Sequence, residues 1–382
     1  MVSASVRLAQ DLVRIDTVNP PGRESLAAQV IAQRLAPLGI RIEMYDLSPG
    51  RASLVARYRA SESVPSLCFS GHLDTVPLGI TTWSRNPHGG EIADGKLWGR
   101  GSTDMKGGIA AMVVAFERLC AIGGEHPITL ALTASEETGC QGAHSLLGKL
   151  GKIGALVIGE PTNGELAIAH KGVLWLRLKT RGTAAHASRP ELGENAIERM
   201  LDALTATRKL TFRVNPHPLL GGPTYSMGTI VGGSATNIVP DMCEATIDIR
   251  IVPGMDLARV QQDIKNLTGC ETEVQQVLGL PAVESPADDP WLRRVGQLAQ
   301  RIFGVRSGPA SASFFTDASV LAPALGHPPT AIIGPGNPAL AHQVDEWCSL
   351  AAIDRATDLY ENIGATWHPF SYSTVGAIQK ER

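Results

Sequence analysis

Residues 66–74 read SLCFSGHLD, and this stretch indicates the class of fold. Its first half, Ser66–Ser70, is a short apolar run that predicts a strand buried on both faces. Gly71 ends the run, and His72 and Asp74 follow. A buried strand that leads into an imidazole and a carboxylate is typical of α/β proteins, in which ligands bind beyond the carboxyl ends of the strands.

Two other apolar runs end in the same way. Ile128–Ala134 leads to Ser135-Glu136-Glu137, and Ala155–Ile158 leads to Gly159-Glu160-Pro161-Thr162. A single acidic residue after a strand is usually a solvated loop residue. Three separate strands that each place His, Asp or Glu at this point indicate a ligand site at one edge of a sheet.

Helical patterns alternate with these strands. Amphipathic periodicity predicts helices at Val6–Arg14 and Ser25–Leu38, separated by the breaker Asn19-Pro20-Pro21-Gly22, and a third helix at Asp104–Ala121. Strands that alternate with helices predict a parallel or mixed sheet covered on both faces.

The pattern changes near Gly172. Strands are predicted at Val173–Thr180, Tyr225–Val231, Cys243–Val252 and Glu271–Leu278, and helices at Asn195–Leu210 and Met255–Leu267. This β-α-β-β-α-β order is that of a split βαβ sandwich of the ferredoxin-like type, which is a complete α+β domain.

After the proline-rich segment Pro281–Pro290 the first pattern resumes. A helix is predicted at Trp291–Phe303, a strand at Thr330–Ile333 and a closing helix at Glu346–Trp367. We therefore predict a mixed-sheet α/β domain, residues 1–171 and 284–382, interrupted by an inserted α+β domain, residues 172–283.

The composition is that of an ordinary globular protein. The formal net charge is −3 and no basic run stands out, so we expect no nucleic-acid partner. The strongest apolar stretch, around Ile109–Phe116, is far shorter than a membrane span, and the first residues lack the pattern of a signal peptide. The six scattered cysteines form no C-x-x-C pair and predict reduced thiols in a cytoplasmic protein.

Two further residues extend the candidate ligand set. Asp104 lies in GRGSTDMKGG, residues 99–108, where the alternative interpretation is a helix N-cap. The glycines do not match the dinucleotide pattern G-x-G-x-x-G, because Asp104 occupies the third glycine position. His342, in AHQVDE at residues 341–346, supplies a second imidazole.

These motifs resemble the signatures of the M20 metallopeptidases, a family that includes acetylornithine deacetylase, succinyl-diaminopimelate desuccinylase, aminoacylase-1 and the glutamate carboxypeptidases. The resemblance lies in residues 71–77, 101–108, 135–137 and 159–162 and extends from Asp11 to about Trp347. It implies that the α/β domain is catalytic and that the inserted domain serves as a lid and dimerisation domain.

The resemblance also implies a site for two divalent metal ions. His72 and Glu160 would bind one ion, Glu137 and His342 the other, and Asp104 would bridge the two. Zn²⁺ is the expected metal, with Co²⁺ or Mn²⁺ able to substitute. Three protein ligands at each ion leave a position for water, as catalytic zinc requires.

Three more residues take catalytic roles from the same resemblance. Glu136 would be the general base that takes a proton from the metal-bridging water and delivers it to the leaving amine. Asp74 would orient the imidazole of His72. His186 would reach into the active site of a second subunit and bind the substrate carbonyl oxygen, so a homodimer is expected.

The remaining candidates concern substrate binding. Arg250 and Asn237 match substrate-binding positions of the inserted domain, and a surface salt bridge is the alternative interpretation of Arg250. Gly334 and Gly336 belong to a loop that resembles the family's pocket lining. His170 follows a predicted strand and is a further residue that could lie near the site.

The expected substrate is a small N-acyl-L-amino acid, from which an acyl group of the acetyl or succinyl type is removed. Glu160, where other members have aspartate, favours the deacylases, and residues 332–346 resemble the acetylornithine deacetylase branch. The alternatives are a dipeptidase or carboxypeptidase with the same metals and a non-catalytic binding homologue. The last is disfavoured because no ligand and no base is missing. The sequence contains neither H-E-x-x-H nor G-x-S-x-G.

Overall fold

The computed structural model describes residues 2–61, 63–123, 126–306 and 308–368. The chain forms two compact units. The large unit comprises the chain up to Ala169, Glu284–Ala312 and the chain from Thr316 onward, and the small unit comprises His170–Val283 with Ser313–Phe315. The small unit therefore starts two residues before the expected boundary at 172, and it includes a short segment that the sequence pattern does not indicate.

A mixed sheet forms the centre of the large unit. Its strand order is β1-β2-β6-β3-β7-β15-β8-β13, with β14 paired to β8. β6, β3, β7 and β15 run parallel, so their carboxyl ends lie at the same edge of the sheet. The strands are β1 (Arg41–Ser48), β2 (Arg51–Tyr58), β3 (Ser66–His72), β6 (Ile128–Thr133), β7 (Ile153–Ile158), β8 (Ala167–His170), β13 (Val283–Glu284), β14 (Ala310–Ala312) and β15 (Thr330–Ile332).

Helices cover this sheet, and every residue of β3 is buried, as its apolar sequence predicts. α3 packs against α1 and α9, α7 packs against α9, and α2 packs on β2. The helices are α1 (Ala4–Arg14), α2 (Glu24–Leu35), α3 (Gly107–Ile122), α4 (Gln141–Ser145), α7 (Pro290–Phe303), α8 (Ala318–Ala324) and α9 (Leu350–Ala365). Within the described residues, none of the helices has the length and apolar character needed to cross a membrane.

Local signals set several of the helix ends. The Ser3 hydroxyl accepts the N–H of Val6 at the start of α1, and the Asp289 carboxylate caps α7 in the same way. α3 ends at Ile122 and is followed by Gly123, whose φ of 75° lies in the left-handed region that glycine adopts without strain.

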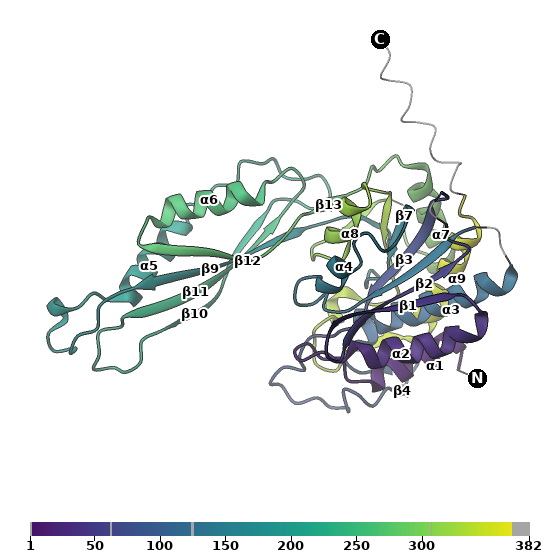
Figure 1. Ribbon diagram of the computed structural model, residues 1–382, viewed down its shortest axis with the longest axis horizontal. Helices are drawn as coiled ribbons and strands as arrows, with labels where there is room; N and C mark the ends of the chain where they lie inside the picture. The colour runs from purple at the N-terminus through teal and green to yellow at the C-terminus, as the bar shows by residue number, and fades with distance from the viewer. Residues whose placement is uncertain (1, 62, 124–125, 307, 369–382) are drawn as a thin grey trace, which may run out of the picture. The chain divides into compact units, whose positions relative to one another are not determined.

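The small unit contains an antiparallel sheet with the order β10-β11-β9-β12 and the helices α5 and α6 (Figure 1). Along the chain the elements are β9 (Gly172–Arg181), α5 (Ala196–Thr207), β10 (Thr224–Gly232), β11 (Met242–Ile251), α6 (Leu257–Thr268) and β12 (Thr272–Leu280). Alternating apolar residues of β9 and β11 form a core with α5 and α6. The predicted mixed α/β fold is confirmed, and the strands and helices of the small unit follow the predicted order β-α-β-β-α-β. Phe315 joins this unit through ring contacts with Trp175 and Arg250.

Two local predictions need correction, and one hairpin was missed. Asp104 is outside the helix that was predicted to include it, because α3 begins only at Gly107 and Asp104 has an extended backbone with φ −123° and ψ 93°. The closing helix begins at Leu350 rather than Glu346, because Trp347–Ser349 pairs with β5 (Lys96–Trp98) as β16, in a small sheet completed by β4 (Glu91–Ala93). The hairpin β1–β2 was not predicted.

Candidate dinuclear metal site

The five expected ligands belong to the large unit and lie where its parallel strands end. His72 is the last residue of β3, Glu137 follows β6, and Glu160 follows β7. His342 belongs to the loop after β15, and Asp104 belongs to the turn that precedes α3. The parallel pairing of these strands brings segments far apart in the sequence to one edge of the sheet.

The two oxygens of Asp104 face two different pairs of ligands. Oδ1 lies 3.0 Å from Nε2 of His72, and that nitrogen lies 3.8 Å from Oε1 of Glu160. Oδ2 lies 3.3 Å from Nε2 of His342, which is also 3.3 Å from Oε2 of Glu137. Ligand atoms at about 2.0–2.2 Å from a tetrahedral ion are about 3.3–3.6 Å from one another. The two distances of the His342 group have this spacing, and those of the His72 group, 3.0 and 3.8 Å, lie just outside it. Ligand atoms of His72, Asp104 and Glu137 also lie within 4.8 Å of one another, which is close enough to share a metal ion.

The electrostatics of the site match a cation-binding role. Burial lowers the pKa of His72, but the nearby carboxylates, with Glu160 foremost, outweigh it and raise the pKa well above its usual value. Hydrogen bonds to Asp104 and Glu137 raise the pKa of His342 to about 10. Burial raises the pKa of Glu160 well above the usual range. Buried Oε1 of Glu137 has no hydrogen-bond partner among the described residues. Metal ions would take the place of the shared protons and satisfy this oxygen.

Asp74 is fully buried, and its side chain and backbone make different contacts. Its backbone carbonyl lies 3.0 Å from Nδ1 of His72, whereas its carboxylate oxygen Oδ1 is 3.6 Å from that nitrogen. The carboxylate accepts the backbone N–H of Glu136 at 3.0 Å, that of Glu137 at 3.2 Å, and Nδ2 of Asn19 at 2.9 Å. Asp74 thus holds the segment that carries Glu137 and the expected base as well as facing the imidazole.

Glu136 is almost completely buried and contacts neither imidazole in the manner of the ligands. Burial raises its pKa well above the usual value. The Sγ of Cys140 lies 4.0 Å from its Oε1. A carboxyl group beside the proposed ligands that is not itself one of them is free to accept and return a proton.

Sequence reasoning missed three residues that support this site. Asn19 was interpreted only as part of a helix breaker, yet its side chain contacts Asp74 and Thr138. Arg100 and Glu346 are buried and form an ion pair of 2.7 Å in the large unit. Arg100 lies four residues before Asp104, and Glu346 lies four residues after His342. This closeness to predicted ligands was the one indication in the sequence that the two residues support the site.

The expected substrate-binding side chains lie in the small unit. The backbone N–H of Ala187 donates to the carbonyl of Asn237 at 3.0 Å, so His186 and Asn237 lie in adjoining segments, and both side chains are exposed. Nδ1 of His186 accepts the backbone N–H of Ser188 at 3.1 Å. The guanidinium of Arg250 binds Asp248 through two hydrogen bonds of 2.9 Å, which is the salt bridge that the alternative interpretation describes.

The two glycines of the predicted pocket loop pack closely on the large unit's backbone. A Cβ at Gly334 would lie 2.4 Å from the carbonyl oxygen of Gly159 and 2.5 Å from that of Glu160. A Cβ at Gly336 would lie 2.6 Å from the carbonyl oxygen of Thr103. Both glycines therefore allow the loop after β15 to approach the ligand-bearing turns.

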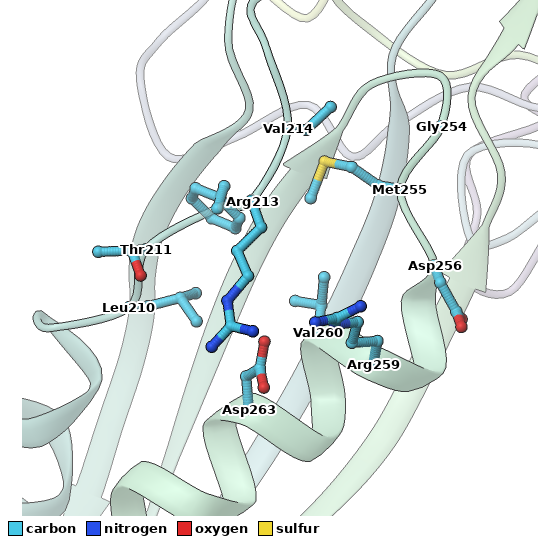
Figure 2. Close-up of a pocket in the computed structure, with 11 residues that line it drawn as sticks. Leu210, Thr211, Arg213, Val214, Gly254, Met255, Asp256, Arg259, Val260 and Asp263 are labelled. Atoms are coloured by element: carbon cyan, nitrogen blue, oxygen red, sulfur yellow. The ribbon is translucent and has the colours of Figure 1, made fainter.

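A pocket of about 170 Å³ lies elsewhere, in the small unit between the segment after α5 and the start of α6 (Figure 2). Leu210, Phe212 and Val260 supply apolar atoms, and Arg213 and Asp263 supply charged ones. None of the expected ligands or substrate-binding residues lines it. The candidate site is thus identified by its side-chain chemistry and not by this hollow.

Residues 68–365 match the sequence model of peptidase family M20/M25/M40. The chain belongs to this family. As an M20 protein it is a metal-dependent amidohydrolase, and the family resemblance inferred from the motifs is confirmed.

Two curated relatives have deacylase names. The chain is 31% identical to an acetylornithine deacetylase of Vibrio vulnificus (strain CMCP6), over 85% of this chain and 86% of the relative. It is 28% identical to a probable succinyl-diaminopimelate desuccinylase of Staphylococcus epidermidis (strain ATCC 12228 / FDA PCI 1200), over 94% and 96% of the two chains.

Solved structures share the fold. The M20 family metallo-carboxypeptidase Sso-CP2 from Sulfolobus solfataricus matches 95% of this chain and 99% of its own, with a TM-score of 0.80 and 16% identity. The Bacillus subtilis YXEP protein, described as a dinuclear metal binding peptidase from the M20 family, matches 94% and 96% with a TM-score of 0.68 and 14% identity.

Proposed function

We propose that this M20 enzyme removes an acyl group of the acetyl or succinyl type from a small N-acyl-L-amino acid. The observation that carries the proposal is the arrangement around Asp104. One of its oxygens faces His72 and the other faces His342, which also contacts Glu137, and Glu136 next to them is not one of the proposed ligands. The names of the two curated relatives support deacylation over peptide cleavage.

We assign two divalent ions, Zn²⁺ in the first instance, to the two sets of ligands. His72 and Glu160 would hold one ion, Glu137 and His342 the other, and Asp104 both. Three nitrogen and oxygen donors for each ion suit zinc and leave a position open. When bound, two such ions lower the pKa of water and polarise a carbonyl group.

Glu136 is assigned the proton transfers. Its carboxylate takes the proton of the attacking water and returns it to the amine that leaves when the amide C–N bond breaks. The carboxyl group holds the proton between these two steps, as a residue that serves first as base and then as acid must. The Asp74 carboxylate accepts the backbone N–H groups of Glu136 and Glu137 and thereby fixes the position of this segment.

The small unit is assigned to substrate binding. Since Nδ1 of His186 accepts a backbone N–H, a neutral ring carries its proton on Nε2, which can then donate to the substrate carbonyl oxygen in the active site of a second subunit. Arg250 has a planar guanidinium suited to a carboxylate, and Asp248 holds it in one orientation. Asn237 supplies a further amide close to His186.

A homodimer through the small unit is part of the proposal. β10 is an edge strand of its sheet, and Val231 on it is 72% exposed, with Ile230, Ile238 and Met242 also exposed. An exposed apolar edge strand favours pairing with another strand. Light scattering of the purified protein tests this, and a monomer at working concentration would contradict it.

The six cysteines are all free thiols, which supports the proposed cytoplasmic location.

A substrate panel on the zinc-loaded enzyme tests the proposed reaction. N-acetyl and N-succinyl amino acids should be hydrolysed at least about tenfold more efficiently than dipeptides, a difference of ~1.4 kcal/mol in transition-state binding. Faster cleavage of dipeptides would identify a dipeptidase or carboxypeptidase instead. No hydrolysis together with no bound metal would indicate a non-catalytic homologue.

Glu136→Gln isolates the role of the base. The amide keeps the size of the side chain but cannot take a proton, so the variant should bind both ions and lose activity by about 10²–10⁴-fold. Glu198→Gln, an exposed substitution on α5, is the matched control. Full activity of the Glu136 variant would refute the assignment.

A further inference from the structure

Arg100 and Glu346 form a buried ion pair that joins two segments of the metal site. Nη1 of Arg100 donates to Oε2 of Glu346 at 2.7 Å, and both side chains are almost completely inaccessible to solvent. Neither residue forms a hydrogen bond or an ion pair with the side chain of a proposed ligand. Their contacts instead go to the backbone that carries these ligands.

The Glu346 carboxylate is an acceptor for the turn that bears Asp104. Oε1 accepts the backbone N–H of Thr103 at 2.8 Å and that of Asp104 at 3.1 Å, while Oε2 accepts the N–H of Gly101 at 3.1 Å. Three buried N–H groups and one guanidinium thus converge on one carboxylate. Since charged acceptors form stronger hydrogen bonds than neutral ones, this carboxylate fixes the path of the turn.

Arg100 fixes the opposite segment, which bears His342. Nη1 also donates to the carbonyl of Gln343 at 3.2 Å, and Nη2 donates to the carbonyls of His342 at 3.4 Å and Pro77 at 3.3 Å. His342 has a positive φ of 64° and a side chain that is 52% exposed, and it is in an irregular loop. Contacts of this kind, and not a strand ladder, therefore determine where its imidazole lies.

The other ligand pair has a different support. His72 is within β3, which pairs with β6 and β7, and Glu160 is the second residue after β7. The ladder bonds of three neighbouring strands hold these two residues with no contribution from Arg100. The two metal positions consequently differ in what positions their ligands.

We infer that Arg100 and Glu346 are positioning residues that hold Asp104 and His342 at the spacing needed by the ion on the His342 side. The inference rests on the ligands proposed above. Loosening the His342 loop through Arg100 should lower affinity for the ion held by Glu137 and His342. Loosening the Asp104 turn through Glu346 should lower affinity for both ions, because Asp104 is a proposed ligand of each.

Arg100→Lys and Glu346→Gln test the inference. Lysine keeps a positive charge beside Glu346 but cannot bind it and the loop carbonyls at the same time, and glutamine keeps one acceptor oxygen where the carboxylate has two. Glu117→Gln is the matched control, because Glu117 of α3 forms a partly buried ion pair of 2.7 Å with Arg34 of α2. Thr103→Val, which removes only a hydroxyl bond to the carbonyl of Trp347, serves if the charge variants do not fold.

The measurement is Zn²⁺ binding to the metal-free protein by chelator competition, with circular dichroism to verify folding. The wild type and Glu117→Gln should bind two ions. Arg100→Lys should bind the ion of His72 and Glu160 with affinity within about threefold of the wild type and the ion of Glu137 and His342 about 10–100-fold more weakly, the usual effect of losing an outer contact. Glu346→Gln should weaken both ions, because it loosens the turn of the shared ligand Asp104. Thr103→Val, which loosens the turn of Asp104, should weaken both ions as Glu346→Gln does.

Two results would overturn the inference. Equal weakening of both ions by Arg100→Lys would mean that the pair supports the fold as a whole, and unchanged binding of both ions in both variants would mean that it positions neither ligand. A wild type that binds fewer than two ions would instead contradict the proposed function, so the two failures are distinguishable.

Discussion

Replacement of Asp74 by Asn examines how one buried carboxylate supports both a ligand and the proposed base. In the wild type its oxygens accept three buried donors, from Glu136, Glu137 and Asn19. The amide has a single oxygen, so whichever way it turns, its NH₂ group faces at least one of these donors. One hydrogen bond to a charged acceptor is then lost, at about 1.5–3 kcal/mol, and the others become neutral and weaker.

We therefore expect Asp74→Asn to lower the free energy of unfolding by about 3 kcal/mol, allowing about 0.5–1 kcal/mol for the weakened bonds. The segment of Glu136 and Glu137 should also shift, and a displacement of about 1 Å at a catalytic group lowers activity by about 10²-fold. Urea denaturation of the metal-free protein and kcat/KM of the zinc-loaded protein measure the two effects.

Asp11→Asn is the control, because the Asp11 side chain is 59% exposed and its ion pair with Arg14, at 3.6 Å, lies on the surface. It should change the stability by less than about 0.5 kcal/mol. An Asp74→Asn variant with the stability and activity of this control would show that the carboxylate does not hold the segment, and the reasoning would be refuted.

Three further predictions concern buried groups. Burial lowers the pKa of His170 to about 4. Between pH 6.5 and 4 the unfolded chain, in which this pKa is about 6.5, binds the proton and the folded chain does not, so the free energy of unfolding should fall by about 3 kcal/mol as the pH drops across this range. Denaturation curves should show a smaller fall for His170→Gln, and the same dependence on pH in both proteins would contradict this. Tyr360→Phe should cost about 1–2 kcal/mol in urea denaturation, since the Tyr360 hydroxyl donates to the buried carbonyl of Ile333 at 2.6 Å, and a neutral result would mean that water replaces it. Gly334→Ala should push the loop away from the carbonyl of Glu160 and weaken zinc binding by about 10–100-fold in chelator competition, whereas full retention would show that the loop can move without cost.

The sequence by itself determined the family, the class of fold and a set of candidate ligands. Strand ends such as Gly71-His72 and Ser135-Glu136-Glu137 are local patterns, and in parallel strands the carboxyl ends must meet at one edge. The order β-α-β-β-α-β after Gly172 was likewise readable, because period-two and helical patterns depend on burial of one face.

Only the tertiary structure decided what supports those ligands. Glu346 was predicted to begin a helix, but Trp347–Ser349 pairs with β5 and leaves its carboxylate to bind the turn of Asp104. Asp74 was expected to face His72, and its bonds to Glu136 and Glu137 depend on the adjacency of β3 and β6. Such contacts join residues tens or hundreds of positions apart, and local patterns in the sequence do not report which distant backbone groups a buried carboxylate will meet.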